Sequence, residues 1–181
     1  SNIPIDESYD QSVELIYERV HQRGGKVVVS GMGKAGQIGV NIATTLSSTG
    51  TPAIFLHPSE AQHGDLGILQ PKDVLILISN SGKTREILEL IFLSDRLYND
   101  LPIICITGNK ASELAQKSKT TLYTGGPEEV CPLGLTPTTS TTCMTVVGDI
   151  LVVSLIKKIG LTKEDYAKRH HSGYLGQKAR S

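Results

Sequence analysis

The chain has 181 residues, 39% of them hydrophobic, which is enough for one domain with a substantial core. Its 18 basic and 18 acidic side chains cancel, so no overall field attracts nucleic acid or an anionic membrane. Three widely spaced cysteines without a C-x-x-C pair argue against a disulfide framework or a zinc site and favour a reduced, cytoplasmic protein. No signal peptide is visible, and the longest apolar stretch, residues 145–156, is predicted to be too short to span a bilayer. We expect a single soluble domain over residues 1–181.

Strand and helix patterns alternate along the chain. An amphipathic helix is predicted over residues 7–23 and ends at Gly24 and Gly25. Unbroken apolar runs such as residues 74–78 are typical of parallel strands that are buried on both faces. The alternation predicts an α/β, doubly wound, flavodoxin-like fold with a five-stranded parallel sheet flanked by helices. The strands are expected at residues 26–30, 53–56, 74–78, 103–107 and 120–123, and further helices at residues 36–48, 84–97, 112–117, 138–159 and 163–168.

Two turns connect a strand directly to a helix. The first, G-M-G-K-A-G at residues 31–36, matches the dinucleotide pattern G-x-G-x-x-G. However, the next strand lacks the acidic residue that would hold a ribose, and Ala35 stands where a Walker A loop needs a hydroxyl. The second turn, S-N-S-G-K-T at residues 79–84, offers hydroxyls and an amide at a helix start, which suits a single terminal phosphate. Ordinary N-capping explains one such residue more easily than four within six.

Several segments together carry a resemblance to a known family. They are S-N-S-G at residues 79–82, H-P-S-E-A-Q-H-G-D-L-G at 57–67, C-P-L-G-L-T-P-T-T-S-T-T at 131–142 and H-H-S-G-Y-L-G at 170–176. From about residue 25 to residue 178 the chain resembles sugar isomerase (SIS) domains, and among them the arabinose-5-phosphate isomerases. The resemblance implies interconversion of D-ribulose 5-phosphate and D-arabinose 5-phosphate through an enediol, the first step of Kdo synthesis for lipopolysaccharide. The tandem CBS pair that often accompanies this family is not found in the sequence.

The sequence departs from the family pattern at two places. Ala35 replaces a serine in the first turn, which removes one candidate phosphate hydroxyl. In the tail, His171 and Ser172 replace the usual proline and first glycine. Counting back from Gly173 favours His170 as the family histidine, with His171 as the alternative.

Isomerisation of an aldose to a ketose needs a base for a carbon-bound proton and an acid for the neighbouring oxygen, which favours His and Glu. His63 follows the second strand, at the edge where ligands gather; a loop histidine that caps local backbone is the alternative. The resemblance assigns His170, in the site of a neighbouring subunit, and the carboxylates Glu86 and Glu129. Lys34 would neutralise the phosphate or the enediolate. The residues predicted to bind the substrate are Gly33, Ser79, Asn80, Ser81, Thr84, Thr138, Thr139, Ser140 and Thr141.

No metal or cofactor is expected, because the reaction needs neither a redox step nor a hydrolytic water; Zn²⁺ on the histidines is expected only as an adventitious inhibitor. The expected partners are a phosphosugar, further copies of the chain in a homo-oligomer, most simply a tetramer, and a downstream inhibitor such as CMP-Kdo. Asp149, inside an apolar helix, is expected to be buried or at a subunit contact. Two alternatives stay open: a sugar-phosphate-sensing SIS module, and an isomerase for another phosphosugar. The pathway that the chain serves, lipopolysaccharide or capsule, also stays open.

Overall fold

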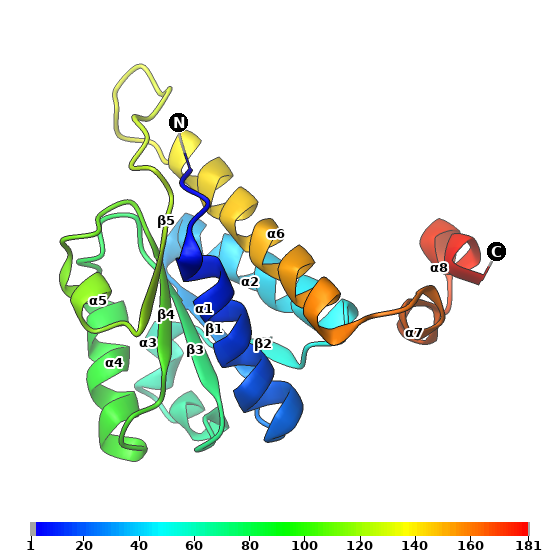
Figure 1. Ribbon diagram of the computed structural model, residues 1–181. Helices are drawn as coiled ribbons and strands as arrows, with labels where there is room; N and C mark the ends of the chain where they lie inside the picture. Colours follow the sequence, from blue (N-terminus) through cyan, green and yellow to red (C-terminus); the bar gives the residue numbers. More distant parts are fainter. Residues whose placement is uncertain (1–2, 181) are drawn as a thin grey trace.

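A computed structural model describes residues 3–180, so the ends of the predicted 1–181 domain lie outside the described residues. Five parallel strands form one sheet in the order β2-β1-β3-β4-β5 (Figure 1). This is the flavodoxin-like order, and it confirms the predicted doubly wound five-stranded sheet. The strands are β1 (Val27–Gly31), β2 (Ala53–Phe55), β3 (Val74–Ile78), β4 (Ile103–Thr107) and β5 (Thr120–Tyr123).

Helices cover both faces of the sheet. The first face is packed by α1, the π-helix η1, α2 and α6, and the second by α3, α4 and α5. The last two helices, α7 and α8, form an arm that projects from the body (Figure 1). The helices are α1 (Glu7–Ile16), η1 (Tyr17–Gln22), α2 (Gly33–Ser48), α3 (Pro58–Ala61), the 3-10 helix η2 (Asp65–Ile68), α4 (Arg85–Leu97), α5 (Glu113–Gln116), α6 (Thr139–Ile159), α7 (Lys163–Arg169) and α8 (Gly173–Arg180).

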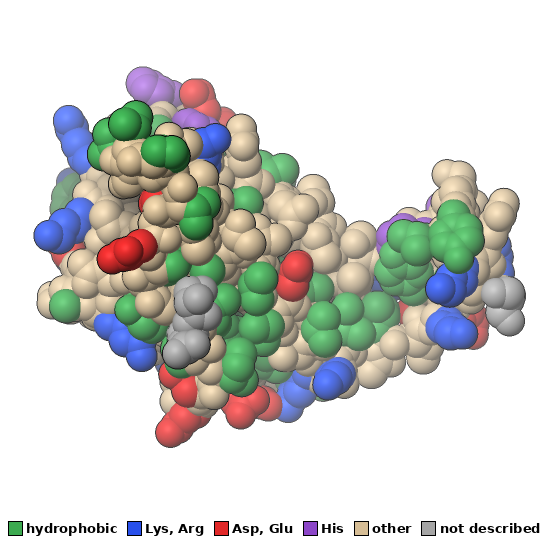
Figure 2. All heavy atoms as spheres, turned by 90° about the horizontal axis from the view of Figure 1, so that it is seen from above, with side chains coloured by type: hydrophobic (Ala, Val, Ile, Leu, Met, Phe, Trp, Pro, Cys, Tyr) green, Lys and Arg blue, Asp and Glu red, His purple; other side chains and the backbone are tan. Residues whose placement is uncertain are grey.

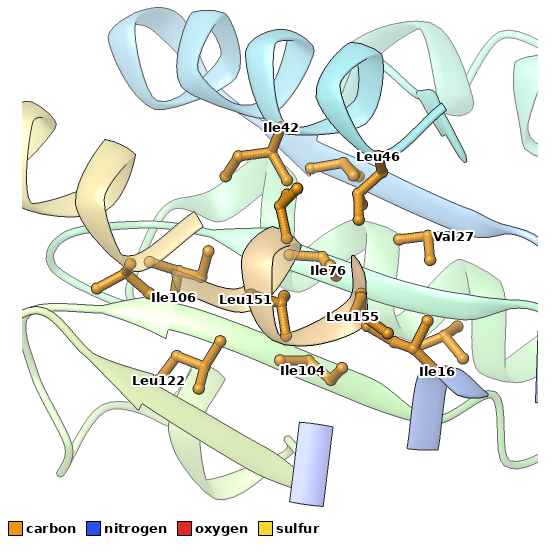
Figure 3. Close-up of a cluster of buried hydrophobic side chains, with 14 of the residues drawn as sticks. Ile16, Val27, Ile42, Leu46, Ile76, Ile104, Ile106, Leu122, Leu151 and Leu155 are labelled. Atoms are coloured by element: carbon orange, nitrogen blue, oxygen red, sulfur yellow. The ribbon is translucent and has the colours of Figure 1, made fainter. Parts of the chain in front are cut away.

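The main core lies between the sheet and α6. Ile76 of β3 is fully buried there, and Leu151 and Leu155 of α6 approach it from the helix layer (Figure 3). Because successive strand residues face opposite sides, Val27 and Val29 join this core whereas Val28 joins the core under α4. The unbroken apolar strands are therefore explained by burial on both faces.

The helix α6 bears on two predictions. At 21 residues and a mean hydropathy of 1.6, it extends beyond the apolar stretch predicted at residues 145–156 and is long and apolar enough by composition to cross a membrane. Its packing is that of a core helix, because eight of its residues are buried against the sheet and α2. Asp149 was predicted to be buried or at a subunit contact, and in the single chain it is exposed, since it lies on the face of α6 that points away from the sheet.

Several local elements differ from the expected boundaries. The helix predicted over residues 7–23 divides into α1 and η1, and the 57–67 loop contains the short helices α3 and η2. The α2 helix begins at Gly33, three residues earlier than predicted. Gly36 allows this early start, because a Cβ at Gly36 would lie 2.6 Å from the Gly31 carbonyl oxygen. The first turn thus brings the start of α2 directly over the end of β1.

Candidate active site

A cavity of about 350 Å³ opens where the strand order reverses, between the carboxyl ends of β1 and β3. This is the position at which ligands bind in doubly wound sheets. A larger hollow of about 470 Å³, between α4 and the beginning of β4, contains no predicted site residue. The cavity at the strand ends brings together the predicted residues Lys34, Ser79, Asn80, Ser81, Thr84, Glu129, Ser140 and Thr141.

The loop between β3 and α4 is held in shape by its own hydroxyls. Ser79 is buried, and its Oγ lies 2.7 Å from Thr84 Oγ1 and accepts the Gly82 N–H at 3.1 Å. The Ser81 Oγ accepts the Lys83 N–H at 3.2 Å. Gly82 has a φ of +64°, and a Cβ there would lie 2.0 Å from Ser112 Oγ, so glycine is required for both reasons. Contacts within the loop and the close approach of Ser112 therefore fix its shape.

Three long helices begin at this cavity, and two of them begin without a side-chain cap. No side chain of the described residues caps α2 at Met32 or α4 at Thr84. Their first N–H groups are thus available to an anion, and the helix dipoles favour one there. The predicted phosphate loop and the first residues of α2, including Lys34, face each other across this region. The uncapped ends of α2 and α4 are therefore the part of the cavity wall that suits an anion best.

The third helix, α6, begins at a carboxylate. Glu129 Oε2 accepts the Thr138 N–H at 2.6 Å, the Thr138 hydroxyl at 2.8 Å and the Ser140 N–H at 3.3 Å. Burial raises the pKa of Glu129, but hydrogen bonds from Ser140 and Thr138 outweigh it and lower the pKa to about 2. A second anion at ~4 Å would be repelled by about 4 kcal/mol per unit charge at an effective dielectric constant of about 20. Phosphate is therefore disfavoured at this end.

The Thr/Ser-rich start of α6 divides into two sets. Thr138 donates both its N–H and its hydroxyl to Glu129, so the structure does not leave it free to bind phosphate as predicted. The Thr139 Oγ1 atom is buried without a hydrogen-bond partner among the described residues, and Thr139 does not line the cavity. Ser140 and Thr141 do line it. Only this second pair faces the cavity, and the Ser140 hydroxyl also hydrogen-bonds Glu129.

Gly33 and Lys34 open α2. Gly33 has a φ of +57°, which favours glycine at this turn, and it is not part of the cavity lining. Lys34 is exposed and lines the cavity in the first turn of α2. Its ammonium group adds a positive charge to a helix start that contains no acidic residue. This fits the predicted role in neutralising a phosphate or an enediolate.

His63 and Glu86 lie outside the cavity lining. His63 is exposed, just after α3, and its N–H donates to the Glu60 carbonyl at 2.9 Å. The neighbouring Gln62 donates to Glu89 Oε2 at 3.1 Å, which joins this loop to α4. Since Glu86 and Glu89 are three residues apart, they share one face of α4, and the His63 loop lies beside that face. The loop that carries His63 is therefore joined to the face of α4 that carries Glu86 and Glu89.

His170 lies on the projecting arm, away from the cavity of its own chain. Its ring stacks on Tyr166 at 3.8 Å between centroids, and its Nδ1 lies 3.0 Å from the Tyr166 carbonyl oxygen. Figure 2 shows the arm standing apart from the body, with histidine on both. The second half of the arm, α8, was not among the predicted helices, and it leaves Tyr174 and Leu175 exposed. One chain alone does not bring His170 to the other predicted residues.

Cys131, which follows Glu129 by two residues, was not among the predicted site residues. Its thiol receives hydrogen bonds first from the Thr136 side chain and then from the backbone of Thr136, Leu133 and Leu135, and these lower its pKa to about 6. By contrast, burial raises the pKa of the Cys105 thiol. The C-P-L-G-L-T segment at residues 131–136 could have indicated this lowered pKa, because its turn places backbone N–H groups around the Cys131 sulfur.

The described residues contain no group of three or more His, Cys, Asp or Glu side chains that could hold a metal ion. The predicted catalytic residues lie in three places. Lys34 and Glu129 are on the cavity wall, His63 and Glu86 are at the side of α4, and His170 is on the arm.

Curated proteins include relatives that match nearly the whole of this chain. Arabinose 5-phosphate isomerase KdsD of Shigella flexneri is 49% identical over 174 residues, which cover 96% of this chain and 52% of KdsD. The Francisella tularensis KdsD is 46% identical with the same coverage. The chain thus spans about half the length of the curated relatives it matches.

Solved structures give matches of nearly full length. A Bacteroides fragilis protein described as a phosphosugar isomerase involved in capsule formation has a TM-score of 0.94 and 63% identity, with 96% of this chain and 90% of that chain covered. An Escherichia coli CFT073 protein in complex with arabinose 5-phosphate has a TM-score of 0.77 and 35% identity, with 91% and 92% covered. The SIS domain family model matches residues 21–154. The chain belongs to the SIS domain family.

Proposed function

We propose that this chain is the isomerase domain of an arabinose-5-phosphate isomerase, which interconverts D-ribulose 5-phosphate and D-arabinose 5-phosphate. The observation that carries the proposal is the pair of uncapped helix starts, α2 and α4, that face one cavity together with Lys34 and the Ser79–Thr84 hydroxyl pair. The KdsD relatives supply the choice of sugar. The product would feed Kdo synthesis, for lipopolysaccharide or, as the Bacteroides fragilis protein suggests, for a capsule.

The proposed chemistry moves one proton between adjacent carbons. A base removes a proton from C1 of the ketose while an acid protonates O2, which gives an enediol. A proton is then delivered to C2 while the proton on O1 leaves, which gives the aldose. The substrate phosphate would lie against the uncapped starts of α2 and α4, and Lys34 would stabilise negative charge on the enediol oxygens. Neither a metal nor a cofactor takes part, and Zn²⁺ would act only as an inhibitor.

The proton-transfer roles are proposed for His63, Glu86 and His170. His63 and Glu86 lie beside the phosphate loop, where a modest loop movement brings them to the sugar. His170 would come from the arm of a second copy, because its own arm holds it away from its own cavity. The exposed Tyr174 and Leu175 of that arm support the contact between copies.

The proposed assembly is a homotetramer in the cytoplasm. Val146 and Val153 of α6 are 41% and 51% exposed, with the exposed Asp149 between them, so this helix presents an apolar stripe for a second copy. An active monomer in a size measurement would contradict the assembly. A downstream product such as CMP-Kdo is proposed as an inhibitor that competes at the cavity, and unchanged rates at saturating CMP-Kdo would exclude it.

The test is proton NMR of D-ribulose 5-phosphate incubated with the protein in D₂O. We expect D-arabinose 5-phosphate with deuterium at C2, because the enediol takes its new proton from a base that exchanges with solvent. Product without deuterium would contradict exchange through such a base. Binding of phosphosugar without turnover would favour a sensor or an isomerase for another sugar.

A further inference from the structure

Glu129 connects two parts of the cavity wall. Its Oε2 holds the N-terminus of α6 through Thr138 and Ser140, and Thr138 Oγ1 in turn accepts the Val130 N–H at 3.2 Å. The two N–H groups and the Thr138 hydroxyl all donate to Oε2, and none of them donates to Oε1. Glu129 also lines the cavity. The Ser140 hydroxyl also hydrogen-bonds this carboxylate. Because each carboxylate oxygen accepts about two hydrogen bonds, Oε2 is fully used at the helix start, and Oε1 still has accepting capacity for a ligand.

A carboxylate held in this way is a strong acceptor and a poor proton carrier. Its hydrogen bonds all favour the charged form, so it stays ionised over the pH range of an isomerase. A general acid or base works best when its pKa lies near the working pH. An ionised carboxylate oxygen is instead the complement of a sugar hydroxyl, from which it accepts a charge-assisted hydrogen bond.

We infer that Glu129 positions the sugar instead of transferring a proton: Oε2 closes the N-terminus of α6 to anions, and Oε1 accepts a hydroxyl of the open-chain phosphosugar. The inference rests on the proposed function and concerns the same cavity. It fixes the direction in which the substrate lies, with the phosphate at α2 and α4 and the hydroxyl chain toward Ser140 and Thr141 at the start of α6.

The first test compares Glu129→Gln with Glu128→Gln in the isomerase assay over a range of pH. Glutamine keeps an acceptor for the α6 N–H groups and loses the charge. We expect KM to rise about tenfold in E129Q, which is the effect of one lost hydrogen bond to a charged group. The kcat value changes by less than about threefold, and the pH midpoints of kcat/KM stay in place. Glu128 is exposed, and E128Q matches the wild type.

A proton-transfer role for Glu129 gives the opposite pattern. It predicts a fall in kcat of at least about 100-fold at nearly unchanged KM, together with the loss of one limb of the pH profile. That result would overturn the inference.

A binding measurement separates the inference from the proposed function. Calorimetry with inorganic phosphate and with D-arabinose 5-phosphate needs no turnover. We expect E129Q to lose about tenfold in affinity for the sugar phosphate and to keep its affinity for inorganic phosphate within about threefold. The variant Thr138→Ala, which leaves the carboxylate but removes its hydroxyl donor, weakens sugar binding in the same direction.

The outcomes are distinct. If the wild type binds arabinose 5-phosphate but does not turn it over, the proposed function fails and the Glu129 inference is still tested by binding. If E129Q loses as much affinity for inorganic phosphate as for the sugar phosphate, Glu129 does not act on the hydroxyl chain and the inference is wrong. The inference is also wrong if the wild type binds the sugar phosphate no more tightly than inorganic phosphate.

Discussion

The pKa values of single residues in and beside the cavity are shifted by backbone N–H groups as well as by side chains. Cys131 shows this in the loop that follows Glu129, where the Thr136 hydroxyl and three N–H groups favour the thiolate. The thiolate is the reactive form of cysteine, so reactivity with alkylating agents reports this arrangement directly.

We expect iodoacetamide to modify Cys131 before Cys105 and Cys143 in the folded protein. The rate at Cys131 should rise with a midpoint at about pH 6, because its pKa is lowered to that value. Cys105 and Cys143 are buried, and burial raises the pKa of Cys105. Thr136→Val should move the midpoint upward by removing the largest stabilising hydrogen bond. Peptide mass spectrometry across a pH series measures each site, and an unchanged midpoint in T136V would contradict this account.

Most of the strands and long helices could be predicted from the sequence. The strands of the sheet and the helices α4 and α6 were predicted to within about two residues, because unbroken apolar runs and helical spacing reflect burial directly. The turns that precede α2 and α4 were also predicted as connections between a strand and a helix, although α2 begins three residues earlier than expected. The Glu129 cap of α6 was not predicted, because it joins two residues that are nine apart in a loop without periodicity. The α8 helix was missed because Gly173 and Gly176 indicate a turn.

The Glu129 cap should contribute stability that depends on pH. The folded-state pKa of about 2 lies below the ordinary value of 4.5, so the carboxylate stabilises the fold fully above pH 4.5. This contribution is lost as the pH falls from about 4.5 to about 2. We therefore expect the free energy of unfolding of the wild type to fall more steeply over this range than that of E129Q. Urea unfolding at several pH values measures the difference, and parallel curves would show that the cap does not stabilise α6.

The contact between α2 and β1 is the second element-scale feature that sets the cavity. We expect Gly36→Ala to lower the free energy of unfolding by about 1–3 kcal/mol, the usual effect of overpacking, because the added methyl would lie 2.6 Å from the Gly31 carbonyl. The matched control is Gly67→Ala, where nothing lies within 4 Å and the change should stay within about 0.5 kcal/mol. Thermal unfolding of both variants provides the comparison. Equal melting temperatures would mean that α2 can move away from β1 at no cost.

At the scale of the whole molecule, the arm is the feature that one chain does not explain. The α7 and α8 helices pack on each other, and Arg169 of α7 reaches the body near Gly50, while Tyr174 and Leu175 stay exposed. The sequence placed His170 in a neighbouring subunit only through the family resemblance. The apolar periodicity of one chain does not indicate which copy of the chain its α7–α8 arm contacts.

Mixed oligomers test whether His170 acts across subunits. Lys34→Ala removes a residue of the body, and His170→Ala removes one of the arm, so each variant alone should be nearly inactive. In a randomly mixed assembly of both variants, half of the sites have an intact body and half of these receive an intact arm. We therefore expect about one quarter of the wild-type activity if the arm comes from another copy, given a symmetric oligomer. If the arm serves its own chain, every site lacks one residue or the other, and mixing restores nothing. The two arrangements thus differ in an activity that neither parent variant has, and a measurement of size on the same sample shows that the subunits have mixed.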